Sequence, residues 1–327
     1  MQLQEEQKQN KHYPNKKPLI ILTGPTAVGK TALSLNLAEA VNGELISADS
    51  MQVYRFMDIG TAKIMPEEQR GIKHYLIDVF DPTEDFNVVI FQSMAKEAME
   101  KIYAQGKIPI VVGGTGFYIQ ALLYDIDFED TEVSAYRKEL TDYYEKNGAH
   151  ALHELLKDVD PVSYNEIHEN NIKRVIRALE FYHDTGYPIS RHNEEQRQKE
   201  SPYNFSYFVL NHDRNILYKR IEDRIDQMVQ DGLVEEVNKL LSYGCTKEMV
   251  SMQGLGYKEI IPYLEHTCTL EEAIYTLKRD TRHFAKRQLT WFRREKEVTW
   301  IDKTQFASEE EMLQFMLTKL KEKNILP

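Results

Sequence analysis

The sequence predicts an α/β fold in which helices flank a parallel β-sheet and an all-helical module is inserted. Three observations support this prediction. Short apolar strands alternate with amphipathic helices up to about residue 124, strand patterns nearly vanish over residues 125–202, and one returns at Phe205–Leu210. Alternating strands and helices are typical of parallel sheets, since helices provide the crossover connections. We therefore expect a sheet domain at residues 18–124 and 203–327, and an inserted helical domain at residues 125–202.

The first expected strand, Leu19–Leu22, leads into a glycine-rich loop and then into an amphipathic helix. The loop fits the pattern G-x-x-x-x-G-K-[ST], whose glycines let backbone N–H groups point toward a phosphate while the new helix adds its positive end. Lys30 would pair with the outer phosphates, and the Thr31 hydroxyl would bind Mg²⁺. A P-loop NTPase-like fold that binds a nucleotide or a diphosphate is therefore predicted, with binding residues Gly24, Pro25, Thr26, Ala27, Val28, Gly29, Lys30 and Thr31.

Other strands are expected at residues 44–48, 75–79 and 108–112. Asp49 directly follows the second strand, and ligands of open α/β sheets bind at the carboxyl ends of strands, so Asp49 should face the glycine-rich loop. Gly113–Gly116 predicts a second loop of close backbone approach. Helices are expected at residues 86–105, 117–122, 215–229, 233–243 and 270–294, and in the module after Pro161 and at 171–182, whereas residues 191–202 are expected to be polar and mobile.

The expected helix at residues 270–294 carries two stripes of side chains. Its apolar stripe is predicted to be Leu270, Ile274, Leu277 and Phe284. At 100° per residue, four basic side chains fall within an arc of about 60° on another face. They are Arg279, Arg282, Lys286 and Arg293. A single basic residue on a helix is usually only solvated, but a phased stripe favours an RNA-binding surface.

The composition of the chain disfavours several protein classes. No run approaches the roughly 18 apolar residues of a membrane span. Residues 1–17 lack the apolar stretch of a secretory signal and are expected to form a flexible tail. The two cysteines, Cys245 and Cys268, match no zinc pattern and indicate a reduced, cytoplasmic compartment. A net charge of −11 argues against nucleic-acid binding when taken alone, but the placement of the basic residues decides.

The kind of chemistry depends on what accompanies the glycine-rich loop. Hydrolytic proteins of this class usually carry an Asp at the end of a later strand as a second magnesium partner. Here the strand at residues 108–112 ends in Gly113-Gly114-Thr115, without an acid, and no guanine-reading motif is present. ATPase and GTPase functions are therefore disfavoured, while a small-molecule kinase that uses Asp49 stays open.

Seven motifs occur in an order that is similar to one known family. They are G-P-T-A-V-G-K-T (24–31), I-S-A-D-S-M-Q-V-Y (46–54), M-D-I-G-T-A-K (57–63), G-G-T-G-F-Y (113–118), R-A-L-E (177–180), G-L-G-Y-K (254–258) and K-R-Q-L-T-W-F-R (286–293). From about Leu19 to Arg294 the chain resembles the tRNA dimethylallyltransferases, also called tRNA isopentenyltransferases, of the bacterial type. The resemblance implies transfer of the dimethylallyl group of dimethylallyl diphosphate to N6 of adenosine 37, next to the tRNA anticodon, with release of diphosphate.

The resemblance also implies roles for individual residues. The glycine-rich loop would hold the diphosphate of the prenyl donor, with Mg²⁺ as cofactor on Thr31, and Asp49 would be the general base that takes the N6 proton as the C–N bond forms. A structural role for Asp49, bonded to Thr31 or to a metal-bound water, stays open. Thr115 would contact the tRNA near the reacting base. Arg220 or Arg224 would clamp the diphosphate, with a surface ion pair to Glu222 or Asp223 as the alternative. The expected catalytic residues are Asp49, Thr115, Arg220 and Arg224.

The expected tRNA-binding residues are spread over the sheet domain, the module and the long helix. They are Asp49, Ser50, Met51, Gln52, Thr115, Arg137, Lys173, Arg174, Val175, Ile176, Arg177, Gln253, Gly256, Tyr257, Lys258, Arg279, Arg282, Lys286, Arg287, Gln288 and Arg293. Gln253 departs from the arginine that is common in the family. The expected partners are the anticodon stem-loop of tRNA and dimethylallyl diphosphate, and a monomer without membrane contact is expected. The target base would leave its stack at a cost of a few kcal/mol.

Three other functions stay open. A prenyltransferase that acts on free adenine nucleotides would need neither the module nor the basic stripe. A small-molecule kinase would turn over ATP with a metabolite. A non-catalytic RNA-binding protein would not depend on Asp49.

Overall fold

The structure, a computed structural model, describes residues 16–128 and 135–326 and divides the chain into two compact units. The larger unit is formed by the chain before Tyr124 and after Ser201, and the segment between these boundaries forms the smaller one. Most of the expected N-terminal tail, residues 1–17, lies outside the described residues. Lys17 itself contacts the larger unit, because its Nζ bonds to the Glu100 carboxylate at 2.7 Å.

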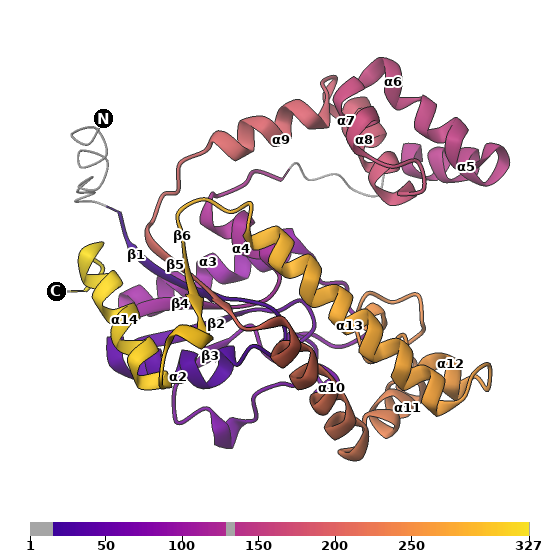
Figure 1. Cartoon of the computed structure of the whole chain (residues 1–327). Coiled ribbons are helices and arrows are strands. Elements are labelled where there is room, and N and C mark those ends of the chain that lie inside the picture. The colour runs from indigo at the N-terminus through magenta and orange to yellow at the C-terminus, as the bar shows by residue number, and fades with distance from the viewer. Residues whose placement is uncertain (1–15, 129–134, 327) are drawn as a thin grey trace. The chain divides into compact units, whose positions relative to one another are not determined.

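A six-stranded sheet forms the centre of the larger unit (Figure 1). Its strands are β1 (Pro18–Thr23), β2 (Gly43–Ala48), β3 (His74–Tyr75), β4 (Ile108–Gly113), β5 (Asn204–Asn211) and β6 (Val298–Asp302). Their order is β3-β2-β4-β1-β5-β6, and every neighbouring pair is parallel. β1 and β2 are buried along nearly their whole length, as expected when helices cover both faces of a parallel sheet. The predicted α/β fold is therefore confirmed.

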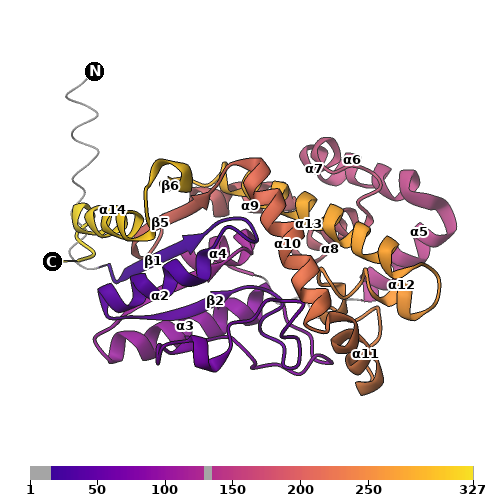
Figure 2. The ribbon, with the colours of Figure 1, turned by 60° about the horizontal axis from the view of Figure 1, so that its bottom comes forward.

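The larger unit contains the helices α2 (Lys30–Val41), α3 (Val88–Ala104), α4 (Gly116–Leu123), α10 (Arg214–Gln230), α11 (Leu233–Tyr243), α12 (Ile261–Leu264), α13 (Leu270–Phe292) and α14 (Glu309–Glu322). The β1-to-β2 and β3-to-β4 crossovers run in opposite directions, so right-handed connections place α2 and α3 on opposite faces. In Figures 1 and 2, α11 and α12 lie at one end of this unit and α14 at the other. None of the helices described is both long and apolar enough to span a bilayer.

The strand predicted at residues 75–79 is wrong over most of its length, because β3 ends at its first residue. Leu76 and Asp78 adopt left-handed backbone conformations, with φ of 63° and 55°, which interrupt an extended strand. The chain instead runs beside the turn that follows β2, where Val79 N–H donates to the Val53 carbonyl at 2.9 Å. A tertiary contact has therefore overridden the apolar, β-branched pattern of this segment.

The buried face of α13 is offset from the predicted apolar stripe. Leu277 is buried, but Leu270, Ile274 and Phe284 are only half-buried, so the prediction is wrong for these three. The buried face consists of Ala273, Leu277, Thr281, Ala285, Gln288 and Phe292. α13 contacts α4 and α10. The small side chains of its buried face allow close packing there, and its buried polar groups require hydrogen-bond partners.

The smaller unit is helical and contains no strand in its described part. Its helices are α5 (Ala135–Glu154), α6 (Leu156–Val159), α7 (Pro161–Glu166), α8 (Ile172–Thr185) and α9 (Ile189–Gln198). The buried core is formed by Leu140, Leu152, Leu156, Val175, Ile176, Ala178 and Leu179. Asp160 ties α7 to α9, since its carboxylate accepts the N–H groups of Ser163 and Ser190, each at 3.0 Å.

The segment expected to be polar and mobile, residues 191–202, is polar and forms the helix α9 up to Gln198, which the sequence analysis did not predict. The helix buries no residue, which explains why its sequence has no apolar stripe. Ser190 Oγ anchors its first turn by donating to Asp160 at 2.6 Å. One helical turn along, Arg191 pairs with Glu195 at 3.0 Å, an i,i+4 contact that supports an exposed helix.

Candidate functional site

The glycine-rich loop joins β1 to α2 at the carboxyl end of the sheet. Gly24 has φ of 149°, and a Cβ atom added there would lie 2.6 Å from the Leu210 carbonyl oxygen, so this turn requires glycine. Gly29, with φ of 93°, precedes the first residue of α2. Lys30 Nζ donates to the carbonyl oxygens of Gly24 and Pro25 at 3.0 and 2.9 Å. The ammonium group therefore lies over the loop whose N–H groups would face a phosphate.

Three cations gather at this loop. Burial lowers the pKa of Lys30 to about 8, an effect opposed by the charge of Asp49 and assisted by that of Arg224. Burial also lowers the pKa of Arg224, which interacts electrostatically with Asp49 and Arg220. Arg220 Nη2 would lie 3.5 Å from a Cβ atom added at Gly29. Over the part of the chain that the structure describes, none of the three cations has an ion-pair partner. Such a cluster is a site for an anion of high charge.

Asp49 lies at the end of β2, and its charge acts on both Lys30 and Arg224. Its Oδ1 accepts the N–H groups of Met51 and Gln52 at 2.9 and 3.3 Å. These bonds orient the carboxylate, and within the described ranges Oδ2 has no hydrogen-bond partner. Among the described residues, no bond joins Asp49 to the Thr31 hydroxyl, which was one form of the structural alternative; its other form, a bond to a metal-bound water, stays a prediction. One oxygen is therefore held while the other can accept a proton.

Gln288 of α13 links the glycine-rich loop to the second loop at residues 113–116. Its Oε1 accepts the Thr26 N–H at 2.9 Å, and its Nε2 donates to the Gly114 carbonyl at 2.9 Å. The side chain is only 6% exposed and both of its polar groups are occupied. Gln288 is therefore a positioning residue for both loops, and its predicted tRNA contact stays a prediction.

The second loop is packed too tightly for side chains at its glycines. A Cβ atom at Gly114 would collide with Gln288, and one at Gly116 would collide with the Trp291 ring. Thr115 lies between them, half-buried, and its N–H donates to the Ala48 carbonyl at 3.2 Å. This bond ties Thr115 to the end of β2, one residue before Asp49, so the two predicted catalytic side chains belong to adjoining turns.

The M-D-I-G-T-A-K turn at residues 57–63 is held by one carboxylate. Glu236 of α11 accepts the N–H groups of Asp58, Ile59 and Gly60 at 2.9, 2.8 and 3.0 Å. It also accepts the Tyr257 hydroxyl at 2.7 Å. Burial, with the charge of Glu236 second, raises the pKa of Tyr257 well above its ordinary value. This four-bond arrangement, the Glu236 clamp, joins two of the sequence motifs and gives Tyr257 a structural role. The predicted tRNA contacts of Tyr257 and of the buried Gly256 stay predictions.

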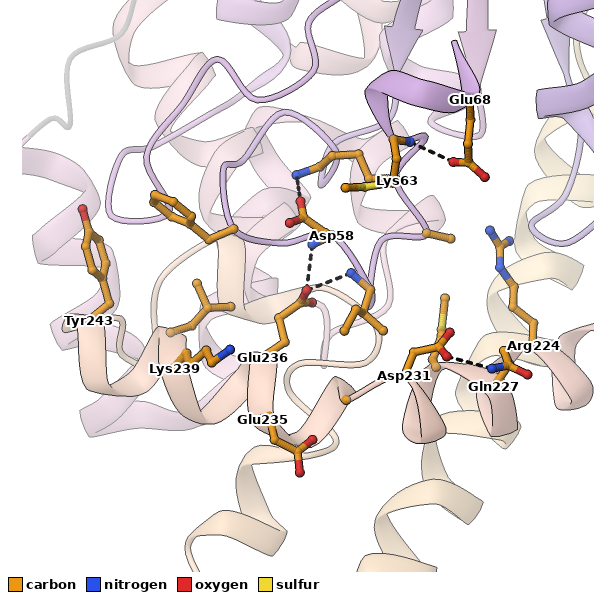
Figure 3. Close-up of a pocket in the computed structure, with 17 residues that line it drawn as sticks. Asp58, Lys63, Glu68, Arg224, Gln227, Asp231, Glu235, Glu236, Lys239 and Tyr243 are labelled. Atoms are coloured by element: carbon orange, nitrogen blue, oxygen red, sulfur yellow. Dashed lines mark hydrogen bonds and ion pairs between the residues drawn. The ribbon is translucent and has the colours of Figure 1, made fainter. Parts of the chain in front are cut away.

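A cavity of about 1030 Å³ lies between this turn and the helices α10 and α11. Figure 3 shows Glu236 pointing at Asp58 on one wall, while Arg224 extends from α10 on another. Its charged lining residues are Asp58, Lys63, Glu68, Arg224, Asp231, Glu235, Glu236 and Lys239. Acids outnumber bases in this lining, so the cavity is unsuited to phosphates. Because Arg224 also interacts with Asp49, the cavity borders the anion site without containing it.

The basic stripe on α13 is divided between paired and unpaired side chains. Arg282 is paired with Glu222 of α10 at 2.6 Å, and Arg279 with its neighbour Asp280 at 2.7 Å. Glu222 is thus occupied and is not the partner of Arg220. Within the described ranges, Lys286, Arg287 and Arg293 are exposed and have no ion-pair partner. The surface available to RNA is therefore narrower than the predicted stripe.

Further predicted tRNA-binding residues of the larger unit lie close to Asp49 or on exposed turns. Ser50, Met51 and Gln52 are half-buried beside Asp49. Gln253 is exposed and donates to the Lys247 carbonyl, and Lys258 is exposed with Glu259 at 3.7 Å.

In the smaller unit, the predicted residues separate by burial. Val175 and Ile176 are core residues at 0% and 8% exposure, so their predicted tRNA contact is contradicted for the side chains. Arg137 forms a bidentate pair with Glu180 at 3.0 and 2.6 Å. Arg177 lies 3.5 Å from the same carboxylate. On α8, the exposed cations are Lys173 and Arg174.

The residues around Thr31 fit the predicted magnesium ion. Thr31 is exposed in the first turn of α2, and its hydroxyl donates to no protein group among the described residues. No group of three or more His, Cys, Asp or Glu side chains that could hold a metal occurs in residues 16–128 and 135–326. A magnesium ion on Thr31 would therefore take most of its oxygen ligands from phosphates and water, as Mg²⁺ does in phosphate-loop proteins.

Sequence reasoning missed Lys303, which approaches the loop from the residues after β6. Its Nζ lies 3.4 Å from the Val28 carbonyl and 3.1 Å from a Cβ atom added at Gly29. The sequence does contain a signal for the strand before Lys303, since residues 298–302 read Val-Thr-Trp-Ile-Asp, a short run of residues that favour strands and that ends in an acid. A sixth strand beside β5 brings whatever follows it to the same edge of the sheet as the glycine-rich loop.

Comparisons with known proteins place these features in a family. A family model described as IPP transferase matches residues 52–295, and the glycine-rich loop precedes that range. The chain is 61% identical over 310 residues to a tRNA dimethylallyltransferase of Lachnoclostridium phytofermentans, which covers 94% of this chain and 99% of that protein.

Solved structures agree in fold. A tRNA isopentenylpyrophosphate transferase from Bacillus halodurans is 45% identical, with a TM-score of 0.71 over 94% of this chain and 98% of the other. A eukaryotic dimethylallyltransferase acting on tRNA is 29% identical, with a TM-score of 0.80 over 94% of this chain and 80% of the other.

Proposed function

The chain belongs to the IPP transferase family, and we propose that it transfers the dimethylallyl group of dimethylallyl diphosphate to N6 of adenosine 37, beside the tRNA anticodon. The family match and the names of the relatives confirm the enzyme class expected from the motifs, a prenyl transferase that modifies tRNA. The donor, the acceptor atom and the residue roles that follow are part of the proposal.

One observation carries the assignment of the donor site. Lys30, Arg220 and Arg224 converge on a glycine-rich turn and are not ion-paired within the described residues, while Asp49 lies beside them. A diphosphate carries enough negative charge to satisfy this cluster, and the loop N–H groups supply further donors. The leaving group would therefore be held where its charge grows as the C–O bond breaks.

The proposed reaction balances on these groups. The bond between C1 of the donor and the ester oxygen of its α-phosphate breaks, and a bond from C1 to adenine N6 forms. The nitrogen loses one proton, which the Asp49 carboxylate accepts, and the diphosphate leaves with Lys30 and the two arginines as its counter-ions. Neutral adenine N6 is not acidic enough to lose its proton first, so transfer to Asp49 accompanies bond formation. General-base help of this kind contributes about 10²–10⁴-fold to the rate.

A magnesium ion on Thr31, when bound, would add positive charge to the diphosphate oxygens. The chain's own residues supply the rest of the site. Gln288 fixes the two loops, and the Oδ1 bonds to Met51 and Gln52 hold Asp49 in place.

The tRNA would be held by exposed cations while the target base is extruded, because phosphate contacts position an RNA without reading its sequence. In the larger unit, Lys286, Arg287 and Arg293 support this role, and in the smaller unit Lys173 and Arg174 do so. Extrusion costs a few kcal/mol, which such contacts can offset.

Incubation with unmodified tRNA and labelled dimethylallyl diphosphate, followed by nucleoside analysis, tests the proposal. We expect label in N6-dimethylallyladenosine, none in a tRNA with guanosine at position 37, and none in free AMP. Equal labelling of AMP would favour the prenyltransferase of free nucleotides. Turnover of ATP with a metabolite, without prenyl transfer, would favour the kinase, and tRNA binding without either reaction would favour a non-catalytic RNA-binding protein.

A further inference from the structure

Lys303 carries a positive charge into the glycine-rich loop from a part of the chain that no motif marked. It begins the 3₁₀ turn Lys303–Gln305, directly after β6. Its side chain is only 10% exposed. Because β6 pairs with β5, the residue following β6 arrives at the same sheet edge as the loop that follows β1.

The ammonium group of Lys303 has only long contacts among the described residues. Its nearest acceptors are the Val28 carbonyl oxygen at 3.4 Å and the Glu309 carboxylate at 3.5 Å. Both distances exceed the 2.7–3.2 Å of a normal N–H···O bond. An ammonium group has three protons to donate, and a buried charge with long contacts is costly. Lys303 is therefore placed to gain from an anion bound at the loop.

Lys303 and Arg220 point at the same spot. A Cβ atom added at Gly29 would lie 3.1 Å from Lys303 Nζ and 3.5 Å from Arg220 Nη2. Burial and then the charges of Arg220 and Lys303 lower the pKa of His212, so His212 lies within electrostatic range of both cations. Lys30 and Arg224 interact electrostatically with Asp49, whereas Lys303 and Arg220 are the two cations next to Gly29.

We propose that Lys303 is a further diphosphate-binding residue, which contacts the phosphate oxygens over Gly29 together with Arg220. This inference rests on the proposed function, since it takes the diphosphate of the prenyl donor to lie on the glycine-rich loop. Glu309 of α14 is the competing carboxylate: it holds Lys303 loosely when the loop is free, and the diphosphate displaces it.

Binding of inorganic diphosphate, measured by isothermal titration calorimetry without tRNA, tests the proposal. We expect Lys303→Met to weaken binding about tenfold or more, as expected for the loss of a hydrogen bond to a charged group. Lys303→Arg should stay within about threefold of the wild type. Lys319→Met is the matched control, since Lys319 lies on α14 and pairs with Glu322 at 2.7 Å, away from the loop.

Glu309→Gln separates ligand binding from a structural role of Lys303. Removal of the competing charge should tighten diphosphate binding, whereas a merely structural pair predicts weaker binding in both Glu309→Gln and Lys303→Met. That second pattern, or Lys303→Met affinity equal to that of Lys319→Met, would overturn the role of Lys303. Failure of the wild-type protein to bind diphosphate would overturn the proposed function itself.

Discussion

The glycine-rich loop and the turn at residues 57–63 differ in whether their charged side chains are paired. At the glycine-rich loop, Lys30 and Arg224 have no ion-pair partner in the described chain. At the turn of residues 57–63, Lys63 is paired with Asp58 at 2.6 Å, and Glu236 is saturated by three N–H groups and a hydroxyl. Unpaired charges are available to a ligand, whereas paired ones stabilise a backbone conformation. The two motifs are equally prominent in the sequence, but the charges of the glycine-rich loop are available to a ligand, whereas those of the turn at residues 57–63 stabilise its backbone.

The strongest test of this contrast is Asp49→Asn. The amide retains an oxygen for the N–H groups of Met51 and Gln52, so the turn should persist, but it cannot accept the N6 proton. We expect kcat to fall by about 10²–10⁴-fold with tRNA affinity little changed. Single-turnover prenylation and a tRNA-binding assay provide the measurements, and a variant at full rate would remove Asp49 from the mechanism.

Glu236→Gln tests the opposite side of the comparison. A glutamine places an NH₂ group against backbone N–H donors, so at least one buried donor loses its acceptor. We expect the free energy of unfolding to fall by about 2–3 kcal/mol, measured by urea denaturation. Glu235→Gln, an exposed neighbour outside the Glu236 clamp, is the control and should change stability little. If Glu236→Gln instead kept full stability and abolished diphosphate binding, the division between the two turns would fail.

The lowered pKa of Lys30 predicts a pH dependence of diphosphate binding. Burial lowers the pKa of Lys30 to about 8, so the free protein loses this positive charge as pH rises through 8. Diphosphate affinity should therefore fall between pH 7 and pH 9, by about tenfold at most per pH unit for one coupled proton. Titration calorimetry across this range measures it. Lys30→Arg keeps its charge at every pH tested and should flatten the profile; an unchanged slope would assign the dependence to another group.

The smallest effect is expected on the tRNA surface, where the same contrast separates Lys286 from Arg282. Lys286 is exposed without an ion-pair partner in the described residues, whereas Arg282 is paired with Glu222. Lys286→Ala should weaken tRNA binding a few-fold and reduce the slope of log K against log[salt] by about 0.7–0.9, one phosphate contact. Arg282→Ala is the matched control and should leave that slope unchanged. Equal slope changes in both variants would show that pairing does not decide which cations meet RNA.

Much of the candidate site could be predicted from the sequence because it depends on local sequence patterns. The glycines of residues 24–31, the lysine and the following helix predict the phosphate loop wherever they occur between a strand and a helix. Asp49 could be placed near that loop because parallel strands end at one edge. Gln288, Lys303 and the Glu236 clamp could not be placed in this way, since each acts on a partner far away in the chain.

By itself, the sequence determined the alternation of strands and helices, the glycine-rich loop and the family, because these depend on short-range backbone geometry and on motifs read in order. Only the tertiary structure decided which charged side chains are paired. Arg282 and Arg137 form ion pairs with carboxylates, and Gln288 is buried against both loops. Lys303 lies at the glycine-rich loop because it follows β6. The physical reason is that a charge is paired or unpaired according to what lies within about 4 Å of it, and long-range packing sets those neighbours.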